Sequence, residues 1–306
     1  MREQLRKNIV QQLWNQYRDT SPDMLRIEAA LSRKGVSRLI LDHFAIIDLP
    51  GPNSGISYLS QIFSEIGYIE QGRDYLADKQ NDFLWMAESS SRELPAPDAL
   101  PQVVVADFRL DEMPAEIRAI IEKYSHLAQK APLQTIRNLS QQASSGNAEA
   151  AKHCTSIIMQ YLSGRDWPLP TISEFLMVRE FNELLSWVLI FGRRPNHFTL
   201  SIHLLDYFTS LAGFHRFIEE EVQLRLNSEG GTLKGGESAG IEQGSTLGIS
   251  RTVKLVDGEI DIPTGFVEFV WRYPGPDCEK PMRWNDYFTG FIAQHADRVI
   301  ESLYTQ

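Results

Sequence analysis

The stretch with the clearest chemical potential in this sequence is residues 194–203, Arg-Pro-Asn-His-Phe-Thr-Leu-Ser-Ile-His. Its proline and asparagine predict a turn, and the β-branched, aromatic and aliphatic residues that follow predict a strand. A strand would place His197, Thr199, Ser201 and His203 on one face and the apolar residues between them on the other. An imidazole at the start of such a strand is a candidate metal ligand, although an isolated histidine is more often a hydrogen-bonded core residue.

Two other strand-like stretches carry ligand-type residues. His43 interrupts the apolar run 38–48, and Glu268 stands among Phe, Val and Trp in 265–273. A carboxylate buried there must be paired, protonated or metal-bound. With His197, these residues would make the two-histidine, one-carboxylate facial triad of non-haem Fe(II) oxygenases. Zinc would accept the same ligands and leave a bound water for a hydrolase or lyase. The separations of the three residues along the chain carry no information on whether their side chains meet.

Composition limits the class of protein. The chain of 306 residues predicts two subdomains or one large domain, and the net charge of -10 argues against a nucleic-acid partner. No apolar run approaches the length of a membrane span, and the N-terminus lacks the apolar core of a signal peptide. The two cysteines are far apart and form no zinc motif or disulfide framework, so a cytoplasmic location is expected.

The first candidate ligand falls in a predicted β-α-β-β-β module over residues 38–110. Residues 1–37 precede it and are expected to form two amphipathic helices, over 2–18 and 23–33. Within the module, the hydrophobic pattern predicts a strand at 38–48, a helix at 56–66 and short strands at 68–71, 83–87 and 103–108.

A second β-α-β-β-β module, with a C-terminal helix, is predicted over residues 192–306. Between the two modules, residues 111–191 are expected to form a helical insertion that ends in one helix over 172–191 and leaves His126 and His153 at the surface. The second module has a helix at 211–226, Gly-rich hairpins between 230 and 258, and a strand at 265–273. The predicted fold is therefore α+β, with a duplicated module whose two sheets curve toward each other.

Several motifs, taken together and in order, give the sequence a specific resemblance. They are Leu41-Asp42-His43-Phe44-Ala45, residues 106–111 (ADFRLD), residues 186–189 (SWVL) with 196–199 (NHFT), 230–235 (GGTLKG), 243–246 (QGST) and 265–272 (GFVEFVWR). From about residue 38 to 273 the chain resembles the short branch of the 2-oxoadipate dioxygenase/decarboxylase family, also called hydroxyglutarate synthase. That family belongs to the vicinal-oxygen-chelate, or glyoxalase-like, superfamily.

The resemblance implies an enzyme with one Fe(II) held by His43, His197 and Glu268. Its substrates would be a small 2-oxo acid and O2, and oxidative decarboxylation would give a 2-hydroxy acid, a step of lysine breakdown when the substrate is 2-oxoadipate. Zn, Ni or Mn could replace the iron. The alternatives are a glyoxalase-like metal-dependent lyase or hydrolase and a non-catalytic binding protein on the same scaffold.

Four polar residues on the Gly-flanked strands of the second module are predicted to contribute to the pocket wall. They are Lys234, Gln243, Ser245 and Thr246. The alternative is that they are exposed hairpin residues.

One position departs from the resemblance. Family members carry an arginine four residues after the first histidine, where it grips the substrate carboxylate, and this chain has Ile47 there. Arg272, four residues after Glu268 on the same strand face, is the predicted replacement cation; its alternative role is a surface ion pair. The loss of the family arginine predicts that 2-oxoadipate itself is a poor substrate.

Overall fold

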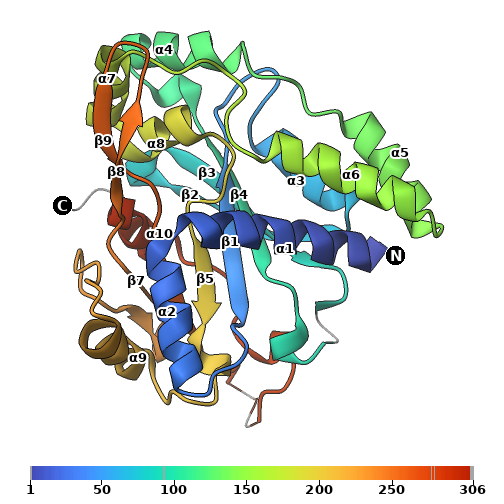
Figure 1. Ribbon diagram of the computed structural model, residues 1–306, viewed down its shortest axis with the longest axis vertical. Helices are drawn as coiled ribbons and strands as arrows, with labels where there is room; N and C mark the ends of the chain where they lie inside the picture. Colours follow the sequence, from blue (N-terminus) through green and yellow to red (C-terminus); the bar gives the residue numbers. More distant parts are fainter. Residues whose placement is uncertain (1, 92–93, 277, 279, 304–306) are drawn as a thin grey trace.

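The protein is built around one curled sheet, as seen in a computed structural model that describes residues 2–91, 94–276, 278 and 280–303. Residues 1 and 304–306 of the predicted first and last segments lie outside the described residues. The sheet has eight strands in the order β2-β3-β4-β1-β5-β10-β7-β6 (Figure 1). Its strands are β1 (Leu41–Ile47), β2 (Tyr68–Leu76), β3 (Asn81–Glu88), β4 (Gln102–Phe108), β5 (Phe198–Ser201), β6 (Lys234–Gly236), β7 (Ile241–Ser245) and β10 (Glu268–Arg272). A separate hairpin pairs β8 (Ser250–Lys254) with β9 (Glu259–Pro263).

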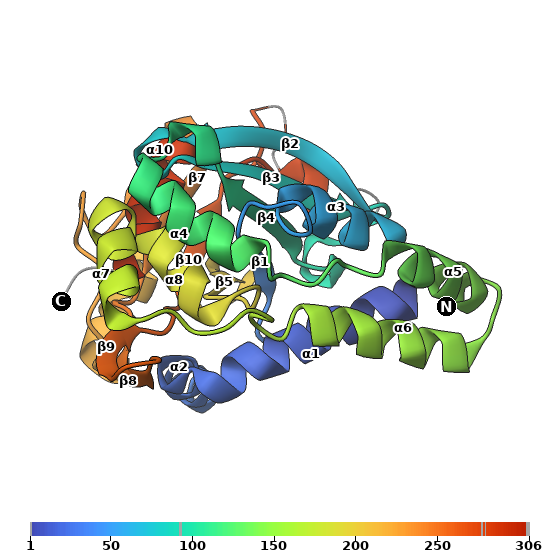
Figure 2. The same ribbon diagram turned by 90° about the horizontal axis from the view of Figure 1, so that it is seen from above.

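The helices surround this sheet and fall into three groups along the chain. They are α1 (Arg2–Thr20), α2 (Pro22–Arg33) and α3 (Ile56–Glu65); then α4 (Ala115–Ser125), α5 (Leu133–Ser144), α6 (Ala148–Tyr161), α7 (Ile172–Phe181) and α8 (Glu183–Phe191); and finally α9 (Leu211–Phe217) and α10 (Ala293–Ile300). The middle group occupies the chain between the two halves of the sheet. Figure 2 shows α5 and α6 projecting to one side together with the start of α1.

The sheet consists of two equivalent halves. One half has the order β1-α3-β2-β3-β4 along the chain and the other β5-α9-β6-β7-β10, with the β8–β9 hairpin inserted before its last strand. In each half the first strand pairs in parallel with the last, and the halves join where β1 runs antiparallel to β5. The predicted paired β-α-β-β-β fold is therefore confirmed.

Alternation along the central strands gives the sheet an apolar outer face and a face that lines a cavity. On β1, Phe44 and Ile46 belong to the main core, whereas Ala45 and Ile47 line the cavity. Helix α1 closes the outer face because its four-residue repeat turns one apolar stripe toward the sheet, as the sequence predicts. The ring of Tyr17 from this helix lies 5.4 Å from that of Phe198 on β5.

A second core covers the cavity face. It joins the β1 and β4 residues Ile47 and Ala106 to α4, α8 and the C-terminal segment, where Phe291 and Val299 contribute. The site thus lies between the curled sheet and these helices, which cover part of the cavity.

Two helices are shorter than the sequence pattern predicts. The predicted helix 172–191 is divided at Asn182, whose backbone is extended and whose side chain caps α8 by accepting from the amide of Leu185 at 2.9 Å. The predicted helix 211–226 gives way after Phe217 to a π-helical turn that ends at Gln223, a residue with a φ of 58°. Hydrophobic periodicity continues through both breaks and therefore does not reveal them.

The predicted strand at 194–203 is also too long. Only 198–201 form β5, and the chain then enters a 3-10 turn at Ile202–Leu204. His203 consequently leaves the face of His197 and packs its ring 4.8 Å from that of Tyr287. The expectation that His203 shares a sheet face with His197 is wrong.

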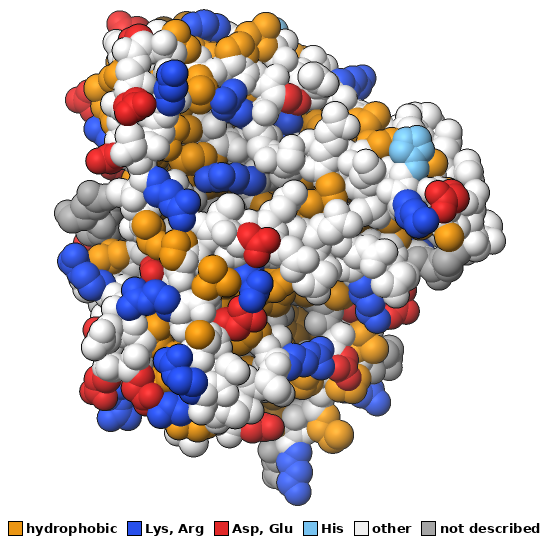
Figure 3. All heavy atoms as spheres, viewed as in Figure 1, with side chains coloured by type: hydrophobic (Ala, Val, Ile, Leu, Met, Phe, Trp, Pro, Cys, Tyr) orange, Lys and Arg blue, Asp and Glu red, His pale blue; other side chains and the backbone are white. Residues whose placement is uncertain are grey.

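The surface agrees with the composition. Basic and acidic side chains are interspersed over the face seen in Figure 3. Within the described part of the chain, no helix is both long enough and apolar enough to cross a membrane.

A partly buried carboxyl at the end of β4 gives a pH-dependent prediction. Asp107 accepts from the amide of Ile56 at 2.9 Å where α3 begins, and burial raises its pKa to about 7. Its unfolded pKa is about 3.9, so ionisation of the native carboxyl destabilises the fold increasingly as pH rises through that interval. Asp107→Asn keeps an acceptor for Ile56 and should raise the melting temperature at pH 8 but leave it nearly unchanged at pH 4. An equal effect at both pH values would contradict this.

Candidate metal centre

A bulge in β1 brings His43 and its neighbour Asp42 to the same side of the sheet. Leu41 pairs with Leu200 and His43 with Thr199, so Asp42 is an extra residue in the ladder. Its carboxylate accepts from Nδ1 of His43 at 2.7 Å. This contact fixes the imidazole so that Nε2 points into the cavity.

His197 is held in an equivalent way by the residue before it. Its Nδ1 donates to Oδ1 of Asn196 at 2.7 Å, and its ring stacks on Phe266 with centroids 4.8 Å apart. The chain before β10 can come this close because residue 265 is glycine: a Cβ there would lie 2.5 Å from the carbonyl oxygen of Asn196.

Glu268 joins the two histidines through strand register. On β10 it pairs with Thr199 of β5, and Thr199 in turn pairs with His43. Thr199 Oγ1 donates to Oε2 of Glu268 at 3.0 Å and lies 3.1 Å from Nε2 of His43. The other carboxylate oxygen accepts from Nε2 of Gln243 at 2.7 Å. Both oxygens of Glu268 are thereby fixed.

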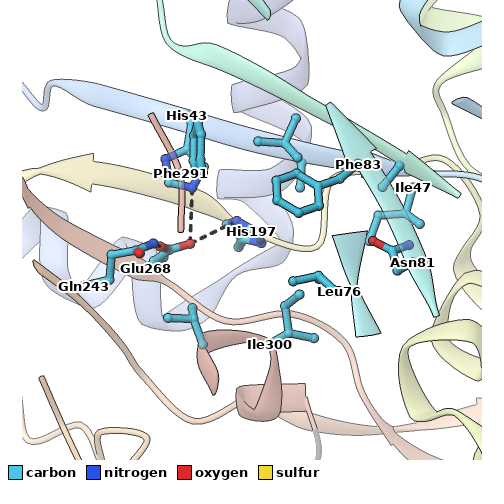
Figure 4. Close-up of a pocket in the computed structure, with 14 residues that line it drawn as sticks. His43, Ile47, Leu76, Asn81, Phe83, His197, Gln243, Glu268, Phe291 and Ile300 are labelled. Atoms are coloured by element: carbon cyan, nitrogen blue, oxygen red, sulfur yellow. Dashed lines mark hydrogen bonds and ion pairs between the residues drawn. The ribbon is translucent and has the colours of Figure 1, made fainter. Parts of the chain in front are cut away.

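The three side chains form a compact ligand set that is buried on the cavity face. Oε2 of Glu268 lies 3.4 Å from Nε2 of His43 and 3.1 Å from Nε2 of His197, and the three ligand atoms all lie within 4.8 Å of one another (Figure 4). Bonds of about 2.1 Å at right angles would separate neighbouring ligand atoms by about 3.0 Å. The donors therefore fit one divalent metal held by two imidazoles and one carboxylate.

The charges around these donors also suit a cation. Burial opposes ionisation of Glu268, but attraction to His43 and His197 outweighs it and holds the pKa of Glu268 well below its ordinary value. Burial also lowers the pKa of His43, yet Glu268 and Asp42 together raise that pKa to about 8. Burial dominates at His197 and lowers its pKa. A site that attracts a proton between an ionised carboxylate and an imidazole offers the same place to a metal ion.

The ligand set opens into a cavity with about 540 Å³ of space free of protein atoms, part of it open to solvent. Of the four predicted wall residues, Gln243 lines this cavity. Ile47, which stands at the position of the family arginine and is also a candidate substrate-binding residue, lines it as well. Phe291 closes it from the C-terminal segment and meets the ring of His43 edge-on, with centroids 4.7 Å apart.

The other predicted wall residues are buried and are not among the residues that line the cavity. Lys234 donates to the carbonyl of Asn227 at 3.1 Å, Ser245 shares a hydrogen bond of 2.6 Å with Ser302, and Thr246 accepts from the amide of Val267. All three are at most 2 % exposed, so the alternative of exposed hairpin residues is wrong. Direct contact with a substrate remains a prediction only for Gln243 and Ile47.

Arg272 has a different role from the one predicted. It is fully buried, and its Nε and Nη2 donate to the two oxygens of Asp42, both at 2.8 Å. Its Nη1 donates to the carbonyls of Phe288 and Gly290. With its guanidinium committed to these acceptors, Arg272 fixes the carboxylate that orients His43. Arg272 is therefore neither the predicted substrate anchor nor part of a surface ion pair.

The sequence reasoning missed the two residues that orient the imidazoles. The available signal was a repeat, since Asp42-His43-Phe44 and Asn196-His197-Phe198 share the same pattern of a polar side chain, histidine and phenylalanine. The contribution of Phe291 carried no sequence signal, because it depends on how the C-terminal segment docks.

Comparison with known proteins confirms the resemblance predicted from the motifs. No protein-family model matches the chain. The chain is 25% identical to the chloroplastic 2-oxoadipate dioxygenase/decarboxylase of Arabidopsis thaliana over 310 aligned residues, which cover 98% of this chain and 78% of the relative. It is 26% identical to the protein of the same name from Oryza sativa subsp. japonica over 270 residues, which cover 85% and 68%.

Solved structures share the fold. The hydroxyglutarate synthase of Oryza sativa, crystallised with 2-oxoadipate, superposes with a TM-score of 0.78 at 24% identity and covers 99% of this chain and 93% of its own. A protein from Ralstonia eutropha JMP134 assigned to the glyoxalase superfamily gives a TM-score of 0.77 at 14% identity, with coverages of 89% and 84%. The curled sheet of paired modules is thus common to these proteins.

The ligand set predicts the metal content of variants. His197→Ala removes one of three donors, so the purified protein should lose most of its bound divalent metal. His153→Ala, at an exposed helix position, is the matched control and should keep it. Elemental analysis measures both. Equal metal content in the two variants would show that His197 is no ligand.

Asp42→Asn tests the orienting contact. The substitution keeps the shape of the side chain but removes the charge that faces His43 and Arg272, so metal affinity should fall by about 10- to 100-fold. Asp206→Asn, an exposed position, serves as the control. Titration with a competing chelator gives the dissociation constants, and an unchanged constant for Asp42→Asn would refute the role.

Proposed function

We propose that this protein is an Fe(II)-dependent dioxygenase/decarboxylase that converts a 2-oxo acid into a 2-hydroxy acid shorter by one carbon. The observation that carries the proposal is the cluster of His43, His197 and Glu268 at one end of a buried cavity. Support comes from the relatives named 2-oxoadipate dioxygenase/decarboxylase and from the shared fold of the rice enzyme that binds 2-oxoadipate.

Ferrous iron at this site would supply chelation of the 2-oxo acid through its carboxylate and keto oxygens and a binding position for dioxygen. The protein's own contribution is to fix the donors. Asp42 and Asn196 hold the Nδ1 atoms of the two histidines, and Gln243 and Thr199 hold the two oxygens of Glu268. Three donors on one side leave the cavity side open to both substrates.

The cavity residues control water and the product hydroxyl. Phe291 and the α10 residues Val299 and Ile300 cover the ligands and limit access of water to the reacting centre. Oε1 of Gln243 is buried and has no hydrogen-bond partner among the described residues. Gln243 lines the cavity beside Glu268, and we predict that its Oε1 accepts a hydrogen bond from the hydroxyl group of the 2-hydroxy acid.

Two finer assignments are predictions that follow from this proposal: iron rather than Zn, Ni or Mn, and a cytoplasmic location. A role in lysine breakdown would follow only if the substrate were 2-oxoadipate. Two other functions are distinguished by the same experiment: a glyoxalase-like lyase or hydrolase, which would not consume oxygen, and a binding protein without turnover.

Oxygen uptake is the deciding assay. Protein loaded anaerobically with Fe(II) should consume one O2 and release one CO2 for each 2-oxo acid converted, whereas the Zn(II)-loaded protein should do neither. His197→Ala should abolish the reaction and His153→Ala should retain it. Bound metal without oxygen uptake for any 2-oxo acid, in a protein that hydrolyses or isomerises another substrate, would replace this proposal with the lyase or hydrolase alternative.

A further inference from the structure

We infer that the substrate is a 2-oxo acid with one carboxylate and an uncharged, mainly apolar side chain, rather than a dicarboxylic 2-oxo acid. This inference rests on the proposed function, because it takes the 2-oxo carboxylate to lie at the metal. It concerns the opposite end of the cavity, to which the rest of the substrate must extend.

The two ends of the cavity differ in chemistry. Figure 4 shows Glu268 and Gln243 together at the end of the cavity where the candidate metal-binding residues lie. Ile47, Leu76 and Phe83 lie toward the other end. The only polar side chain labelled at that far end is Asn81, and its Nδ2 already donates to the carbonyl of Asp107 at 2.8 Å. The far wall is therefore apolar with one neutral amide.

The cavity extends along strand β1, whose residues His43, Ala45 and Ile47 line it. Ala45 lies two residues from His43 on the same face, and Ile47 lies four residues away, which corresponds to roughly 13 Å at about 3.3 Å per residue. Ala106, the β4 partner of Ile47, also has a small side chain. The alanines leave room for a hydrocarbon chain, and the branched and aromatic side chains beyond them provide the surface that it contacts.

The charges of the metal, the buried side chains and the substrate sum to zero when the substrate is a monoanion. A divalent metal contributes +2 and Glu268 contributes -1, while Asp42 and Arg272 cancel in their ion pair. The single carboxylate of a 2-oxo acid then brings the site to neutrality. A second carboxylate would add an uncompensated negative charge in an apolar cavity, which is unfavourable unless a cation pairs with it.

The described lining residues provide no such cation, since none of them is a lysine or an arginine. Among the described residues of the second module, the buried basic side chains donate to other partners. Arg272 donates to Asp42, and Lys234 donates to the carbonyl of Asn227. Arg193 donates to Asp48 and Asp166. Redirecting any of them toward the cavity would break a buried contact.

The test compares the binding of ligands that differ only at the far end. Pyruvate, 2-oxohexanoate and 2-oxoadipate share the 2-oxo acid group, and the last two differ only by a terminal methyl or carboxylate. We expect anaerobic calorimetry on the Fe(II)-loaded wild type to show 2-oxohexanoate binding at least tenfold more tightly than either pyruvate or 2-oxoadipate. Binding of 2-oxoadipate as tight as or tighter than that of 2-oxohexanoate would overturn the inference. Binding of none of the three would refute the proposed function instead.

Two neighbouring residues give a matched pair of variants. Ile47→Ala should reduce the preference for 2-oxohexanoate over pyruvate, whereas Ile46→Ala, on the opposite face of β1, should leave that preference unchanged. Equal loss in both would show that the apolar wall does not contact the ligand. If either variant fails to fold, the wild-type comparison still decides. Arg298→Ala is tested in parallel, because the side chain of Arg298 lies outside the described residues. Weaker binding of 2-oxoadipate to this variant than to the wild type would show that a cation pairs with the second carboxylate, and would contradict the inference.

Discussion

The site depends on the antiparallel pairing of β1 with β5. Its register places Phe44 opposite Phe198, and their rings stack with centroids 4.8 Å apart on the outer face. Because side chains alternate, the same register turns His43 and His197 into the cavity. A slip of one residue would bury both imidazoles against α1 and expose the phenylalanines to the cavity, so packing of the apolar face enforces the geometry of the ligands.

Buried charge is the second constraint, and the bulge at Asp42 resolves it. A carboxylate beside His43 orients the ring, but an isolated buried carboxylate would be strongly destabilising. Arg272 pairs with it through two hydrogen bonds, and this attraction outweighs burial and holds the pKa of Asp42 well below its ordinary value. The same arginine reaches the backbone at 288 and 290, which leads to the segment carrying Phe291. One ion pair thus links an orienting carboxylate to the cover of the cavity.

Sequence patterns predict the paired modules and the three ligand residues, because burial patterns and residue type both carry information there. They fail where a side chain's partner is set by tertiary contacts. Arg272 looks like a free cation on a strand face, yet a bulge that no pattern reveals brings Asp42 to it. His203 appears to continue the strand face of His197, yet β5 ends at Ser201. The breaks at Asn182 and Gln223 are likewise hidden because apolar periodicity continues through them.

Anomalous diffraction from crystals of the iron-loaded protein tests the central claim most directly. The account predicts one peak at the iron edge in the cavity, about 2.1 Å from Nε2 of His43, Nε2 of His197 and a carboxylate oxygen of Glu268. The Nδ1 atoms should remain bonded to Asp42 and Asn196. A fully loaded protein with its iron elsewhere, or with any of these three residues outside the coordination sphere, would contradict the account.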